Sequence, residues 1–153
     1  MSTDLKSRVA EDTKSAMRAH DKAGLSVLRL LSAEVRQREI DGATALDDAG
    51  VVSVIQKMIK QRRDSIAQYE AGHRPELAAA EAAEIERLSA YLPKQLTPEE
   101  VNALIAEALQ STGATDARGI GKVMGWLKPK LAGRADLGVV SKQVREHLAS
   151  PRD

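Results

Sequence analysis

The 153-residue sequence contains no cysteine and no phenylalanine, and its aromatic residues are one tryptophan and two tyrosines. Without cysteine the chain has no disulfide, thiolate metal site or thiol nucleophile. So few aromatic rings leave almost no stacking platform for single-stranded bases. No apolar run approaches the roughly 20 residues of a spanning helix, so no membrane partner is expected. The N-terminal stretch is charged from Asp4 onward, unlike a signal peptide, which predicts a cytoplasmic protein.

Patterns typical of catalysis are also missing. The histidines at positions 20, 73 and 147 belong to no triad or zinc motif. Glu70 and His73 have the Glu-x-x-His spacing of di-iron bundles, but such sites use two of these motifs, and Gly72 argues against a helix there. We therefore expect no catalytic residue, no metal and no cofactor. The sequence favours a non-enzyme, or at most an accessory to an enzyme.

The residues that are abundant indicate helices. Ala, Leu, Glu, Lys and Arg are good helix formers, and no alternating run of β-branched residues indicates a strand. Apolar residues recur at helical spacing in seven segments. The predicted helices cover residues 5–20, 25–40, 48–71, 75–92, 98–112, 120–131 and 137–148.

The stretch "YLPKQLTPEEV" predicts a boundary between two groups of helices. Pro93 ends the fourth helix because proline lacks an amide hydrogen and clashes with the preceding turn. Thr97 and Glu100 then form a capping box at the start of the fifth helix, with Pro98 in its first position. The sequence therefore predicts an all-α, multihelical protein. It has a four-helix N-terminal subdomain (residues 1–93) and a three-helix C-terminal subdomain (94–153).

Positive charge is concentrated in the C-terminal part. From Thr115 onward there are eight Lys and Arg against four Asp and Glu, although the whole chain carries only +1. This excess of positive charge is explained by a helix face that is exposed to water, and binding to an anionic partner is the alternative explanation. Lys and Arg neutralise phosphates regardless of sequence. We expect six cations to lie on one side of the three-helix module as candidate RNA contacts: Lys122, Lys128, Lys130, Arg134, Lys142 and Arg145.

Glycine and proline interrupt the same region. Gly121 and Gly125 share a helix face, and each costs roughly 1 kcal/mol of helix propensity relative to Ala. We favour a close helix-on-helix contact for them, with access for an RNA backbone as the alternative. Pro129 is expected to kink or end the helix. Trp126 is interpreted as a core or interface residue rather than a stacking platform. Neither a dinucleotide fingerprint nor a phosphate-binding loop fits these glycines.

A second basic cluster, "KMIKQRRDS", lies on the third predicted helix and contains Lys57, Lys60, Arg62 and Arg63. The acid-rich fourth helix offers carboxylates for pairing. We interpret the cluster as charge balance within the chain, with partner binding as the alternative.

Four stretches together resemble the GatB/YqeY family over nearly the whole chain: "LSVLRLLSAEV", "KMIKQRRDSIAQYEAGHRPELAAAEAAEIERLSAYLP", "KQLTPEEV" and "GIGKVMGWLKPKLAGRAD". The resemblance implies an all-helical protein whose smaller C-terminal part is similar to the tail of the glutamine-dependent tRNA amidotransferase B subunit, which is implicated in gripping tRNA. Residues 121–125 match the family's "GKVMG" core. Pro129, Lys130 and residues 133–136 match the run that follows. Lys128 stands where the family often has methionine.

Two functional hypotheses follow. The first is an accessory protein that binds tRNA or structured RNA through the basic C-terminal module. The second is an adaptor that docks on an amidotransferase, an aminoacyl-tRNA synthetase or another protein. A catalytic role in amidation has the least support, because the chain has no counterpart of the B subunit's catalytic core.

Overall fold

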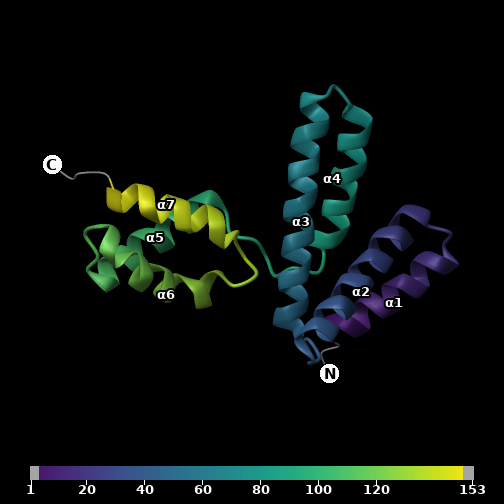
Figure 1. The fold of residues 1–153 in the computed structure, drawn as a ribbon, viewed down its shortest axis with the longest axis horizontal. Helices are drawn as coiled ribbons and strands as arrows, with labels where there is room; N and C mark the ends of the chain where they lie inside the picture. The colour runs from purple at the N-terminus through teal and green to yellow at the C-terminus, as the bar shows by residue number, and fades with distance from the viewer. Residues whose placement is uncertain (1–3, 150–153) are drawn as a thin grey trace. The chain divides into compact units, whose positions relative to one another are not determined.

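The computed structural model describes residues 4–149, which form helices joined by short turns (Figure 1). No strand occurs in that range, so the predicted all-α class is confirmed. None of the helices in this part of the chain is long and apolar enough to cross a bilayer. The helices are α1 (Leu5–Arg18), α2 (Lys22–Gly42), α3 (Asp48–Ala71), α4 (Pro75–Ser89), α5 (Pro98–Thr112), the 3-10 turn η1 (Ala117–Gly119), α6 (Ile120–Leu131) and α7 (Leu137–Ala149).

Polar side chains fix where most helices begin. Asp4, Asp21 and Asp47 each accept a hydrogen bond from the backbone amide three residues later, which satisfies an otherwise unpaired N–H at the helix start. Asp21 was expected in a turn, and its role as a cap makes α2 begin at Lys22 rather than at Leu25. The capping box of Thr97 and Glu100 is confirmed: each side chain accepts a hydrogen bond from the other residue's amide.

Helix ends differ more from the prediction. α1 stops at Arg18, and His20 takes a left-handed conformation with φ of 56°. Gly72 caps α3 as expected, yet the left-handed residue there is His73 rather than the glycine. α4 ends at Ser89, earlier than predicted, because the chain tightens into turns before Pro93, which disfavours helical geometry in the residue preceding it.

The described chain divides into two compact units between Leu92 and Pro93. In the first unit, α1 with α2 and α3 with α4 form two helical hairpins (Figure 1). Their shared core is aliphatic, and from α3 it buries residues only up to Ile59. The core residues are Leu5, Val9, Ala16, Val27, Leu28, Leu31, Val35, Val51, Val54, Ile55, Met58, Ile59, Leu88 and Tyr91.

Beyond that core, α3 and α4 continue as a two-helix hairpin in which Ala78 is buried. Arg62 Nε lies 2.6 Å from Glu84 Oε2 and joins the two helices. This pair confirms the interpretation of the α3 basic cluster as internal charge balance for Arg62. The exposed Lys57, Lys60 and Arg63 form no ion pair within residues 4–149, so for them it is not confirmed.

In the second unit, α6 packs against both α5 and α7. The buried residues are Val101, Ile105, Ala108, Val123, Met124, Leu127, Leu131, Val140, Val144 and Leu148. Two hydrogen bonds connect the residues before α5 to the turn between α6 and α7. The backbone amide of Leu96 donates to the Arg134 carbonyl at 2.9 Å, and the side-chain amide of Gln95 donates to the Gly133 carbonyl at 2.7 Å. The predicted division into subdomains of residues 1–93 and 94–153 stays a prediction.

Candidate nucleic-acid interface

Helix α6 has a buried side and an exposed side. Val123, Met124, Leu127 and Leu131 are buried, and this fixes the rotation of the helix about its axis. With 100° per residue, five exposed residues lie on one continuous arc of α6 outside this buried side. We call this the α6 outer face: Gly121, Lys122, Gly125, Lys128 and Pro129.

The two glycines of this face have open space where a side chain would be. Apart from its chain neighbours and the nearby backbone of α6, a Cβ atom added at Gly121 or at Gly125 would have no heavy atom of the described chain within 4 Å. The close helix-on-helix contact favoured from sequence is therefore wrong for the described residues, because the apolar stripe turns the glycines away from α5 and α7. No packing contact among the described residues offsets the helix propensity that is lost at the two glycines.

Pro129 lies inside α6, which continues to Leu131 rather than ending at the proline. Since proline has no amide hydrogen, the carbonyl of Gly125 cannot receive the usual helical hydrogen bond from the residue four positions later. Gly125 and Pro129 are both exposed. The carbonyl of Gly125 therefore lacks its usual helical donor on the α6 outer face.

Lys122 and Lys128 border this face on opposite edges, with the glycines between them. Both side chains are exposed, and α6 contains no acidic residue. The ion pairs found within residues 4–149 all lie in the N-terminal unit. Neither lysine is therefore neutralised by a carboxylate contact in the described chain.

The other predicted cations are placed differently. Lys130 lies with its Nζ 3.9 Å from the centre of the Trp126 ring, a cation–π contact on the flank of α6. Trp126 is half-buried against the core, which agrees with its interpretation as a core residue. Because Lys130 already covers the ring, a base could stack there only by displacing it.

Arg134 has a structural role. It is half-buried, and its Nε donates to the Lys94 carbonyl at 3.1 Å, so it helps to hold the residues before α5 against the α6–α7 turn. The pKa of the nearby Glu100 carboxyl is lowered mainly because the carboxylate accepts hydrogen bonds from Thr97, with smaller contributions from the charges of Lys94 and Arg134. Arg134 is thus partly committed to neighbours within the chain.

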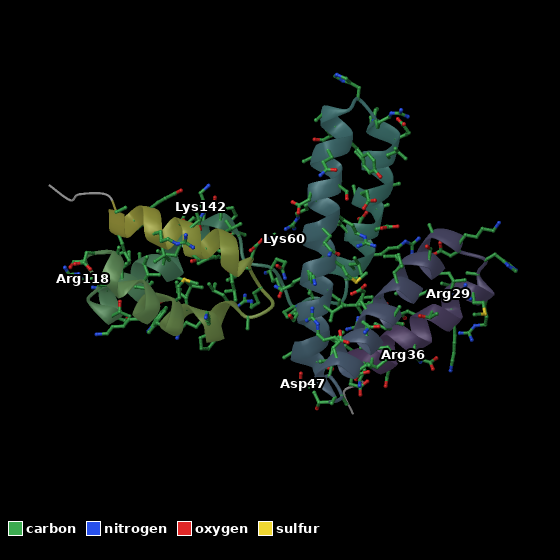
Figure 2. All side chains as sticks on the ribbon, viewed as in Figure 1. Arg29, Arg36, Asp47, Lys60, Arg118 and Lys142 are labelled. Atoms are coloured by element: carbon green, nitrogen blue, oxygen red, sulfur yellow. The ribbon has the colours of Figure 1, made fainter. Side chains whose placement is uncertain are left out.

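Lys142 and Arg145 are exposed on α7, where Arg145 donates to Ser141 Oγ at 3.1 Å. Figure 2 shows Lys142 along α7 and Arg118 beside the start of α6. Arg118 is exposed in η1 and was not among the predicted contacts, although its place just before the glycines could have indicated it. Of the six predicted cations, two border the α6 outer face, one covers Trp126, one anchors a turn and two lie on α7; that all six share one side stays a prediction.

The described residues contain no cluster of three or more His, Asp or Glu side chains that could hold a metal ion. A cavity of about 760 Å³ in the C-terminal unit is lined by His147 together with neutral residues of α5 and of the turn after it. His73 lies outside α3, so the Glu-x-x-His spacing does not become one helix face. No arrangement of these groups points to a catalytic step.

The fold and this surface define a small all-helical protein with an exposed, cationic and glycine-containing face on its C-terminal unit. The family model for Yqey-like proteins matches residues 6–148, and the chain belongs to this family. It is 31% identical over 142 residues to a protein of Pyrenophora tritici-repentis named "Altered inheritance of mitochondria protein 41, mitochondrial", with 91% of this chain and 78% of the relative covered.

Proteins with the same name in Vanderwaltozyma polyspora and Kluyveromyces lactis are 29% and 35% identical, over 65% of this chain in each case. The chain spans about half the length of these two relatives, 55% in each. The relatives are named as mitochondrial proteins, and this finding contradicts the cytoplasmic location expected from the sequence.

Proposed function

We propose that this chain is a non-catalytic accessory protein whose C-terminal unit binds tRNA or another structured RNA through the α6 outer face. The observation that carries the proposal is the open space at Gly121 and Gly125 between two exposed, unpaired lysines. A surface without side chains lets a backbone approach closely. The lysines on its two edges then reach phosphates on either side.

The Gly125 carbonyl, which lacks its usual helical donor, favours RNA over DNA in this proposal. The 2′-hydroxyl is the group that distinguishes RNA from DNA, and it can donate a hydrogen bond to a carbonyl that lacks its helical partner. Because the site offers charge and a backbone acceptor but no free aromatic ring, it suits the sugar-phosphate backbone of a folded RNA rather than unstacked bases.

The link to tRNA amidation belongs to the same proposal. It rests on the resemblance of the C-terminal part to the amidotransferase B-subunit tail, whereas the name of the relatives refers to the inheritance of mitochondria and does not mention RNA. The chain would then act beside a tRNA-modifying enzyme and present tRNA to it, since no catalytic arrangement is found among the described residues.

The test is the binding of unfractionated tRNA, measured by filter binding across a range of salt concentrations. The variant Lys122→Ala/Lys128→Ala is compared with Lys57→Ala/Lys60→Ala, which removes the same charge from exposed positions on α3. Losing two phosphate contacts should lower the slope of log K against log salt by about 1.4 to 1.8. The α3 variant should bind like the unmodified protein.

An RNA hairpin and a DNA hairpin of the same sequence supply the second comparison, and the RNA should bind more tightly. No binding of tRNA at low salt would refute the proposal. Equal losses in the α6 and α3 variants would also refute it, because they would show attraction to charge in general rather than a site.

A further inference from the structure

Helix α2 has an exposed face that the RNA proposal does not use. Its buried residues, Gly24, Val27, Leu28, Leu31 and Val35, occupy one side of the helix. The opposite side carries eight exposed residues that are not acidic, and exposed Asp41 lies at its C-terminal edge, where it accepts a hydrogen bond from Gln37 at 2.9 Å. We call it the α2 outer face: Lys22, Ser26, Arg29, Leu30, Ala33, Arg36, Gln37 and Ile40.

The cations of this face are regularly spaced, and none of them has an acid four residues after it on the helix. Lys22, Arg29 and Arg36 are seven residues apart, which is two helical turns or about 10.5 Å. Figure 2 shows Arg29 and Arg36 on the same helix. A solvated helix commonly places an acid four residues from a cation. Here the residues four positions later are neutral: Ser26, Ala33 and Ile40.

None of the three cations forms an ion pair with a carboxylate within residues 4–149. The charge of Arg36 contributes to the lowered pKa of Glu39, but that shift arises chiefly from the hydrogen bond with Lys6, whose Nζ lies 2.8 Å from the Glu39 carboxylate. Glu39, the carboxylate on which the charge of Arg36 acts, is therefore already paired with Lys6.

Large apolar side chains lie along the same face. Leu30 is 47% exposed and Ile40 is 64% exposed. An open, shallow hollow of about 430 Å³ adjoins the N-terminal part of the face and is lined by Lys22, Leu25, Ser26, Arg29 and Leu30. This hollow combines an apolar floor with two cations, which suits an apolar side chain flanked by carboxylates.

We propose that the α2 outer face binds an amphipathic α-helix of a partner protein that carries carboxylates at seven-residue spacing. Two parallel or antiparallel helices that pack side by side keep a seven-residue repeat in register, and charged residues at the edges of such contacts select the partner. An apolar residue of the partner helix enters the hollow beside Leu30, and another covers Ile40.

A polyanion such as RNA fits this face less well. Phosphates would pair with Arg29 and Arg36 but would leave Leu30 and Ile40 exposed, whereas a protein helix covers both kinds of side chain at once. The proposal concerns the N-terminal unit and is independent of RNA binding at α6.

The probe is a synthetic 21-residue helical peptide with Glu at three positions seven residues apart and Leu beside them, labelled with fluorescein. A twin peptide has Lys in place of the three Glu residues. Fluorescence anisotropy with the full chain should show saturable binding of the Glu peptide and none of the Lys peptide. The charge-reversed variant Arg29→Glu/Arg36→Glu should prefer the Lys peptide instead.

Two further variants separate a built site from simple charge attraction. Leu30→Gln/Ile40→Gln keeps every charge and should weaken binding of the Glu peptide about tenfold or more, because the apolar contact is lost. Lys57→Glu/Lys60→Glu makes the same charge reversal on exposed positions of α3 and should bind the Glu peptide like the unmodified chain. All substituted positions are exposed, and circular dichroism checks that the helices are intact.

Three results would overturn the proposal. The first is no saturable binding of the Glu peptide. The second is unchanged binding by the Leu30/Ile40 variant, which would indicate charge attraction alone. The third is a loss of tRNA or anionic-vesicle binding in Arg29→Glu/Arg36→Glu together with peptide binding that this variant leaves unchanged, which would assign the face to a polyanion.

Discussion

Replacing both glycines of the α6 outer face by alanine should stabilise the C-terminal unit. Alanine at an exposed helix position is more favourable than glycine by about 0.8–1.0 kcal/mol, so Gly121→Ala/Gly125→Ala is expected to add roughly 2 kcal/mol. Nothing in the described chain opposes the new methyl groups, because a Cβ at either position has open space around it. For a unit of this size, 1 kcal/mol shifts Tm by roughly 4–8 °C, so the double variant should melt about 8–16 °C higher.

Trp126 is the only tryptophan in the sequence and lies in α6, so its fluorescence reports on the C-terminal unit. Urea unfolding followed at this residue should show a higher midpoint with an unchanged slope. Gly24→Ala is the matched control. A Cβ there would lie 2.6 Å from an Arg87 guanidinium nitrogen and would press on Asp21, which pairs with Arg87 at 2.9 Å. That single change should stabilise the N-terminal unit less than an α6 substitution stabilises its own unit, because Asp21 and Arg87 must shift to make room.

The same α6 variant also tests function. If the glycines exist for close approach of a sugar-phosphate backbone, the stabilised protein should bind tRNA more weakly while keeping all its lysines. A lower unfolding midpoint for Gly121→Ala/Gly125→Ala would show that the face is covered, which contradicts the structure. A higher midpoint with unchanged tRNA binding would show that the RNA backbone does not approach there.

Four other predictions follow from single features of the structure. Leu127→Ala, at a fully buried core position of α6, should cost about 2–5 kcal/mol in urea unfolding followed by Trp126 fluorescence. Thr97→Ala removes the α5 capping box and should cost about 0.5–2 kcal/mol in the same assay. Glu39→Gln should destabilise the chain at pH 7 but much less in acid: hydrogen bonds from Lys6 and from the Leu46 amide lower the pKa of Glu39 below 4.5, so the stability it contributes is lost as the pH falls through that lowered value. Residues 1–92 and 93–153 expressed separately should each give a cooperative urea transition, and a non-cooperative one would refute two separate domains.

Sequence reasoning located the helices because two kinds of local signal agreed. The apolar spacing of Val51, Ile55, Met58 and Ile59 identified the side of α3 that is buried. Caps such as Thr97 mark a helix start through a hydrogen bond within four residues, so they too can be read from sequence. Helix ends were predicted less well, because α4 stops before Pro93 through turns that depend on the whole local chain.

The candidate site was harder to predict. Which side of α6 holds the glycines could have been derived from the apolar stripe of Val123, Leu127 and Leu131, which puts Gly125 opposite the core. The contact of Lys130 with Trp126 could also have been derived, because the two residues are four apart on one helix. The role of Arg134 could not, because it donates to a carbonyl 40 residues away in the sequence. The position of a cation along the chain does not show whether its side chain already bonds to a residue that is distant in the sequence.

The choice between glycine and alanine at exposed positions indicates where function constrains this chain. On α4, the exposed small residues are alanines, including Ala79, Ala80 and Ala83, and alanine is the best helix former. If α6 needed only small, solvated residues, alanine at positions 121 and 125 would serve equally well and would stabilise the helix. Glycine differs from alanine there by one methyl group, and no atom of the described chain lies where that methyl would be. Under the RNA proposal, what excludes that methyl group lies outside the described chain, and the two exposed lysines on either side suit an anion.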